Sequence, residues 1–168
     1  MLPRTLKNFN IFTNGLNWAG VAQSIQIPKI SRKMEDFRGA GMIGDVALAM
    51  GYEKLEGEIT YAGFDSNHYK QMGTNSISGL PVRYVGVYER QDTGDMQHVE
   101  IYLRGRAKEL DSGEAKNGEK TEVKMSFAYT YFRIEVEGEV LVELDLVNGT
   151  EIFGDSDLAQ STKELLGL

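Results

Sequence analysis

The chain of 168 residues contains no cysteine, which excludes disulfide bonds, thiolate metal ligands and cysteine nucleophiles. Histidine is scarce, with only His68 and His98, so few arrangements could form a catalytic triad or a zinc site. No apolar run is long enough to span a bilayer, and residues 1–10 lack the apolar core of a signal peptide. We therefore expect no membrane anchoring, and one domain over residues 1–168 with its own hydrophobic core.

The chain has fewer positive than negative side chains: 18 Lys/Arg and 25 Asp/Glu give a net charge of −7. Tight binding of nucleic-acid phosphates requires the opposite sign. The charge is uneven along the chain: residues 1–40 carry six Lys/Arg and two Asp/Glu, and residues 41–168 carry twelve and twenty-three. This asymmetry fits either a solvated surface or head-to-tail pairing between copies, and both interpretations stay open at this point.

Alternating polar and apolar residues separated by turn residues indicate a mainly β protein. In residues 96–110, Val99, Ile101 and Leu103 alternate with charged side chains, which is typical of a half-buried antiparallel strand. The fold class that follows is an antiparallel β-sandwich or barrel-like subunit with one internal α-helix and a short C-terminal helix. Strands are predicted over residues 9–13, 18–27, 31–38, 55–64, 82–90, 96–110, 123–136 and 140–147.

Two helices are predicted between and after these strands. The first covers residues 65–72, with Asp65 or Ser66 as its N-cap and with Tyr69 and Met72 facing the sheet. The second covers residues 158–165 and is expected to be capped from residues 155–157.

No motif predicts catalysis, a metal site or a cofactor. The Asp-Thr-Gly triplet at residues 92–94 matches the aspartic-protease motif, but it lies between alternating strands, where it predicts a tight turn. Gly39, Gly41 and Gly44 resemble a phosphate-binding loop without the Gly-Lys-Ser/Thr that would complete it. The acidic side chains of residues 135–145 are typical of a solvated strand face. We predict no catalytic, cofactor-binding or metal-binding residue.

The segment of residues 39–51 is the most unusual in the chain. It reads G-A-G-M-I-G-D-V-A-L-A-M-G, which is too rich in glycine for a stable helix and too apolar for a solvated loop. Such a segment is best explained by a partner surface. We predict an extended apolar arm at residues 39–52 that contacts another subunit through Met42, Ile43, Val46, Leu48 and Met50.

Several blocks together resemble one family, the major tail tube protein of contractile-tailed bacteriophages, which includes the tube of R-type pyocins. The blocks are LPRTLKNFNIFTNG at residues 2–15, IPKISRKMEDFRGAGM at 27–42, RQDTGD at 90–95, LRGRAKELDSGE at 103–114, VEGEVLVELDLVNG at 136–149 and LGL at 166–168. One departure is Ala40, where many relatives are expected to have glycine.

The resemblance implies a structural, non-enzymatic subunit of the inner tail tube, found in the virion tail and assembled in the host bacterial cytoplasm. Six copies would form a ring whose sheets join into a continuous β-barrel lumen, and rings would stack into a rigid tube that conducts DNA. The implied partners are further copies, the sheath protein, baseplate or spike and tail-terminator proteins, and the tape measure protein and passing DNA in the lumen. For the lumen wall, we predict the polar faces of residues 18–27, 31–38, 55–63 and 82–90.

Three alternatives stay open from the sequence, and the third is a carboxylate-dependent hydrolase, which would need a pocket that holds two acids near His98. A bacteriocin tube would use the same subunit without DNA cargo, and only neighbouring genes would distinguish it. A small β-barrel that binds a ligand would instead be a closed monomer with an apolar interior cavity.

Overall fold

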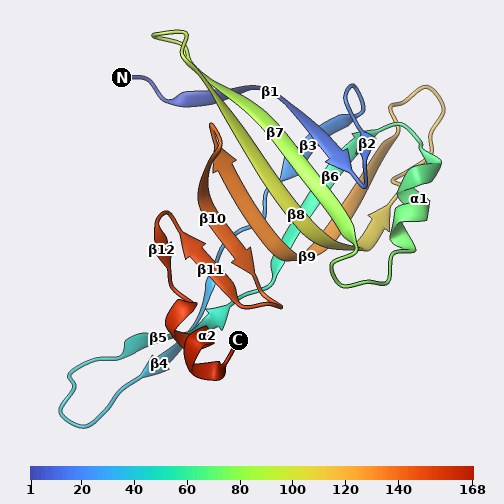
Figure 1. Cartoon of the computed structure of the whole chain (residues 1–168). Helices are drawn as coiled ribbons and strands as arrows, with labels where there is room; N and C mark the ends of the chain where they lie inside the picture. Colours follow the sequence, from blue (N-terminus) through green and yellow to red (C-terminus); the bar gives the residue numbers. More distant parts are fainter.

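The computed structural model describes residues 1–168 and is mainly β, with antiparallel pairing throughout, as predicted (Figure 1). None of its helices has the length and apolarity needed to cross a membrane. The elements in chain order are β1 (Arg4–Thr13), β2 (Leu16–Asn17), β3 (Ala22–Gln26), β4 (Arg32–Phe37), β5 (Val46–Tyr52), β6 (Leu55–Ala62), α1 (Ser66–Met72), β7 (Leu80–Arg90), β8 (Met96–Asp111), β9 (Glu122–Val136), β10 (Glu139–Asp145), β11 (Thr150–Phe153), β12 (Ser156–Asp157) and α2 (Gln160–Leu166).

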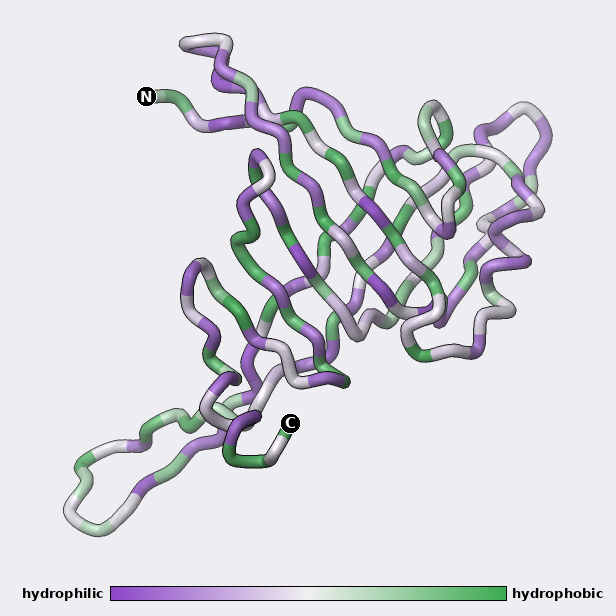
Figure 2. The backbone as a smooth tube through the Cα atoms, viewed as in Figure 1, coloured by the Kyte–Doolittle hydropathy of each residue, from purple (hydrophilic) through white to green (hydrophobic).

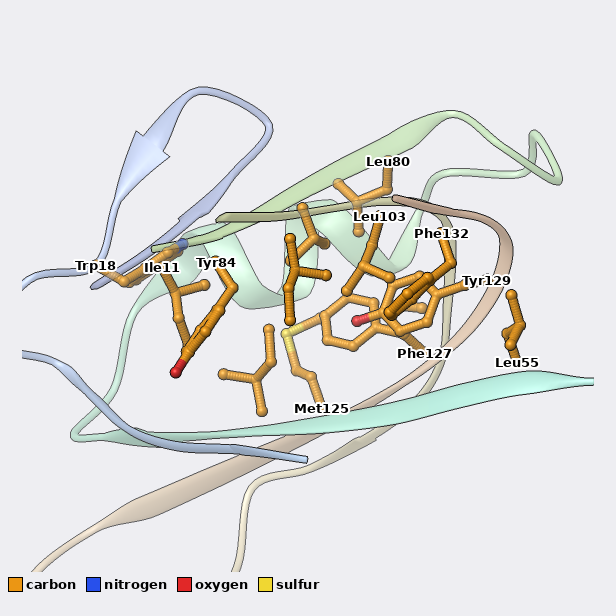
Figure 3. Packing of buried hydrophobic residues seen from close by; sticks show 14 of the residues in the cluster. Ile11, Trp18, Leu55, Leu80, Tyr84, Leu103, Met125, Phe127, Tyr129 and Phe132 are labelled. Carbon is orange, nitrogen blue, oxygen red and sulfur yellow. The ribbon is translucent and has the colours of Figure 1, made fainter. Parts of the chain in front are cut away.

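One ten-stranded sheet makes up the body of the molecule, and it divides along β9. β8 follows one edge of β9, whereas the other edge pairs with β6 over its first half and with β10 over its second half. The sheet thereby folds into two layers, with β1, β7 and β8 facing β3 and β6 (Figures 1 and 3). The pairing of β8 with β9 has a register shift between Arg104 and Gly105, and at Gly105 the two backbones lie too close for a Cβ atom.

The core lies between these layers and consists of 17 buried hydrophobic residues (Figure 3). Alternation along β9 explains its contribution, because Val123, Met125, Phe127 and Tyr129 all point inward, on the same face of the strand. Figure 2 shows this alternation of apolar and polar residues along the strands of the body.

Helix α1 seals one side of the core and has the predicted N-cap: Asp65 accepts a hydrogen bond from the backbone N–H of Asn67 at 2.8 Å. Its buried face differs from the prediction. His68 and Gln71 point inward, whereas Tyr69 is 46% exposed and only Met72 packs on the core as expected. The reason is that His68 and Gln71 make polar and aromatic contacts in the core, whereas hydropathy alone places these polar residues on the exposed face of the helix.

His68 makes the aromatic contacts by lying between two rings. Its ring centroid is 4.7 Å from that of Trp18 and 4.3 Å from that of Tyr61. Gln71 donates to the Thr13 hydroxyl at 2.9 Å, and the Trp18 indole N–H donates to the same oxygen at 2.5 Å. These bonds satisfy part of the buried polar surface and orient α1.

Several predicted boundaries were wrong. Residues 18–27 do not form one strand, because the chain turns at residues 18–21 to insert Trp18 into the core, and Gly20 takes a positive φ of 82° there. The short strands β11 and β12 were not predicted. Helix α2 begins at Gln160 without a side-chain cap, since Asp157 bonds only to the N–H of Ala159, before the helix.

Candidate assembly surfaces

The predicted apolar arm is a β-hairpin rather than an irregular segment. β4 and β5 pair only with each other, and the hairpin projects away from the body (Figure 1). Its tip turns at Gly41, whose φ of 82° favours glycine, and the Met42 N–H bonds the Gly39 carbonyl at 3.2 Å. A two-stranded hairpin without a second layer is at most marginally stable in water, so its apolar side chains lack a partner within the chain.

Four of the five predicted contact residues are exposed on this hairpin. Ile43 at the tip is 100% exposed, and Val46, Leu48 and Met50 lie exposed on one face of β5. Met42 differs, because it is half-buried and its sulfur accepts the Gly39 N–H at 3.0 Å. The fold thus brings four of them, exposed, to one projecting element.

One member of this surface, Phe37, was not predicted, and it is 51% exposed. Met34 is 50% exposed but lies opposite Ala49, on the other face of the hairpin. Phe37 pairs directly with Val46 and therefore shares the face of Leu48 and Met50. The strand predicted over residues 31–38 already contained Phe37. Its place on this surface could be inferred only if residues 46–52 were also recognised as a strand that pairs with it.

The base of the hairpin is attached to the body through Tyr52. Its hydroxyl donates to the Glu151 carboxylate on β11 at 2.5 Å, and burial together with that carboxylate raises the pKa of Tyr52. The Arg32 guanidinium lies 6.0 Å from the centroid of the same ring. A hollow of about 440 Å³ opens beside Tyr52, lined by Ile30, Ser31, Arg32, Met34, Tyr52 and Phe153.

Open strand edges form a second candidate surface. β3 pairs with β6 on one side only, so the other edge of residues 22–26 leaves backbone groups unpaired within the chain. The outer edges of β4 and β5 are open in the same way. Such edges are templates for pairing with another chain.

The outer face of β7, β8 and β9 is charged but compensated within the chain. Arg83 pairs with Glu100 at 2.9 Å, and the Tyr102 hydroxyl, followed by Arg83, holds the pKa of Glu100 below its ordinary value. Arg133 likewise contacts Glu135 and Glu143. A surface hollow of about 450 Å³ there is lined by Phe12, Arg83, Tyr102, Arg104, Tyr131 and Arg133, among others.

The residues considered as catalytic candidates, the triplet at 92–94 and the two histidines, have structural roles. Residues 92–94 form a turn, and the Asp92 carboxylate accepts the backbone N–H of Leu2 at 3.2 Å. His68 is in the core, and His98 lies on the charged face 3.1 Å from Glu100. No group of three His, Asp or Glu side chains is placed to hold a metal ion. The interior between the layers is filled by the core residues, which does not favour the ligand-binding barrel.

Known proteins resemble this chain over almost its full length. Residues 3–167 match the sequence model of a family described as phage tail tube protein FII. The tail tube protein of Escherichia phage P2 is 41% identical over 170 residues, covering 99% of both chains. The major tail tube protein of Serratia phage KSP20 is 33% identical over 149 residues, covering 88% of this chain and 85% of its own.

Solved structures share the fold at low sequence identity. A chain from the sheath-tube complex of the PVC extracellular contractile injection system superposes with a TM-score of 0.59 at 9% identity, covering 79% of this chain and 91% of its own. A chain from the cap of the anti-feeding prophage gives 0.61 at 10% identity, covering 80% and 92%. At these identities the likeness shows the fold alone.

Proposed function

This chain belongs to the phage tail tube protein family, and from that membership we propose that it is the structural, non-enzymatic subunit of a contractile-tail inner tube. Six copies form a ring and the rings stack into a hollow tube. The observation that carries the proposal is the β4–β5 hairpin, which exposes Phe37, Ile43, Val46, Leu48 and Met50 and pairs with nothing else in the chain. Burying these side chains against a neighbour supplies the favourable free energy of assembly.

Ring closure uses the open edges of the sheet. β3 and the outer edges of the hairpin would pair with strands of adjacent copies, which removes the edges and joins the sheets into a continuous barrel. The proposed partners outside the ring are the sheath, baseplate and terminator proteins. Structures of such complexes are the source of the chains that share this fold.

The lumen wall needs a revised assignment. β7 pairs with β1 and β8 and does not neighbour β3 or β6, so the four segments predicted from the sequence do not make one wall. We assign the wall to the outward faces of β3, β6 and the first half of β9. Glu56 and Glu58 lie there, with Lys108 3.2 Å from Glu56.

Passage of DNA fits the overall charge of such a tube. Six copies at −7 each carry −42 per ring, and a net negative tube repels phosphate and does not retain it. We propose the tape measure protein as the other occupant of the lumen, as the family resemblance implies.

The test is assembly of a double variant, Met42→Asp with Ile43→Asp. We expect a folded monomer that forms no rings or tubes, because assembly would bury two unpaired charges. Size-exclusion chromatography and negative-stain microscopy measure assembly, and circular dichroism checks the fold. The control is Ile77→Asp, which changes an apolar residue, 54% exposed, on a loop of the body. Normal tubes from the double variant would disprove the role of the hairpin.

A further inference from the structure

The charged side chains of the β4–β5 hairpin are all without an ion-pair partner inside the chain. Residues 32–52 hold three cations and three anions, and none of the ten ion pairs of the molecule includes any of them. These residues are Arg32, Lys33, Glu35, Asp36, Arg38 and Asp45. On the rest of the chain, by contrast, eight of the fifteen Lys/Arg side chains and eight of the 22 Asp/Glu side chains form ion pairs. The hairpin therefore presents balanced charge that is available to a second surface.

The base of the hairpin has the features of a small receptor site. The hollow of about 440 Å³ is walled by Ile30, Met34, Tyr52 and Phe153, and Arg32 lies at its side. Arg32 is held over the Tyr52 ring and has no carboxylate partner. An occupant of matching chemistry would place an apolar side chain in the hollow and a carboxylate near the guanidinium.

The tip of the hairpin carries this combination. Ile43 is fully exposed, and Asp45, two residues further along, is an exposed carboxylate without an ion-pair partner. Asp45 is also the single charge within residues 39–51.

The tip cannot reach the hollow of its own chain. The six residues of β4 separate the two, and at about 3.4 Å per residue they span about 20 Å. The strands run directly from base to tip without folding back (Figure 1). A hairpin tip that occupies this hollow must therefore belong to another copy of the chain.

We propose that the hollow beside Tyr52 receives the hairpin tip of a second copy, with Ile43 in the hollow and the Asp45 carboxylate paired with Arg32. This assignment rests on the proposed function, because it names the surface that the assembly hairpin binds. Tip and hollow are different patches of one chain, so the contact is head-to-tail and repeats from copy to copy, as a closed ring or a stack requires.

Cysteine cross-linking tests the pairing directly, because the chain has no cysteine of its own. We expect Arg32→Cys and Asp45→Cys subunits, mixed and oxidised under assembly conditions, to form a disulfide-linked heterodimer. Either variant alone should stay uncross-linked. A homodimer of Asp45→Cys would instead indicate tip-to-tip contact and would overturn the assignment, as would assembled tubes without any cross-link.

Charge reversal provides the second test and covers cysteine variants that fail to assemble. We expect Arg32→Glu and Asp45→Arg each to raise the protein concentration needed for assembly by about tenfold or more, and the two changes in one chain to restore it. Lys33→Glu is the matched control, since this neighbouring cation does not line the hollow. If the double reversal fails to restore assembly while the Met42/Ile43 double variant still blocks it, only this pairing is wrong. If that double variant assembles, the proposed function of the hairpin fails as well.

Discussion

Two phenylalanines in strands of the same protein have opposite surroundings. Phe127 on β9 is fully buried between the two layers of the body, whereas Phe37 on β4 is 51% exposed on a hairpin with one layer only. Both strands have antiparallel partners with regular hydrogen bonds. The difference shows that a second layer, rather than strand pairing, provides burial, and that the hairpin lacks this layer within the chain.

The body and the hairpin also differ in their ion pairs. About half of the Lys/Arg side chains of the body form ion pairs within the chain, for example Arg83 with Glu100 and Arg4 with Asp95, whereas none of those on the hairpin does. The hairpin thus has fewer stabilising contacts within its own chain than the body has. Changes made in equivalent positions of the two regions should separate folding from assembly.

The largest effect is expected from Gly105→Ala in the body. A Cβ atom there would lie 2.1 Å from the Ala128 carbonyl oxygen and 2.7 Å from the Tyr129 Cα, so β8 and β9 would have to separate. We expect a loss of at least about 4 kcal/mol in unfolding free energy, measured by urea denaturation. Gly44→Ala at the hairpin tip meets no atom within 4 Å and should leave that free energy unchanged. Equal stability of both variants would contradict the close approach.

The second comparison uses the two phenylalanines. Phe127→Ala should lower the unfolding free energy by about 3–5 kcal/mol, because it leaves a cavity in the core. Phe37→Ala should change monomer stability little and should instead weaken assembly, seen as fewer tubes by negative-stain microscopy at the same protein concentration. A large loss of monomer stability in Phe37→Ala would show that the hairpin packs against its own body.

The smallest expected effect is a pH dependence that belongs to the body alone. Burial lowers the pKa of His68 from its ordinary value of 6.5, against a smaller opposing effect of Asp65. The unfolded chain thus binds a proton at His68 more readily than the folded chain. The contribution of His68 to the unfolding free energy is therefore fully present above pH 6.5 and decreases as the pH falls below that value. His68→Phe should reduce this decrease in urea-denaturation experiments, and His98→Gln on the surface should retain it.

Most body strands were predictable because one face is buried, which produces a period of two. Met96–Asp111 and Glu122–Val136 differ from their predicted bounds by one residue at one end. β5 was missed because Val46, Leu48 and Met50 alternate with alanine, so no polar face marks a strand. The inward face of α1 was misassigned because His68 is buried by stacking on Trp18 and Tyr61, a contact that forms only in the folded chain.

The assembly surface was predictable in part, for a similar reason. An apolar, glycine-rich segment without a place in a monomer can be found from sequence, and it led to Ile43, Val46, Leu48 and Met50. The hollow beside Tyr52 could not be found in this way. Its walls come from residues as far apart as Ile30 and Phe153, which only the chain fold brings together.

The attachment of the hairpin through Tyr52 has a mechanical consequence. A pull on the tip passes first along the backbone, because only Glu53 and Lys54 separate β5 from β6, which pairs with β9. The Tyr52–Glu151 hydrogen bond adds a second connection at the hairpin base, into β11. From there the pull passes through β10 to β9, each joined by a ladder of backbone hydrogen bonds. Tension applied to the hairpin is thus distributed over β6, β9, β10 and β11, and does not depend on a single contact at its base.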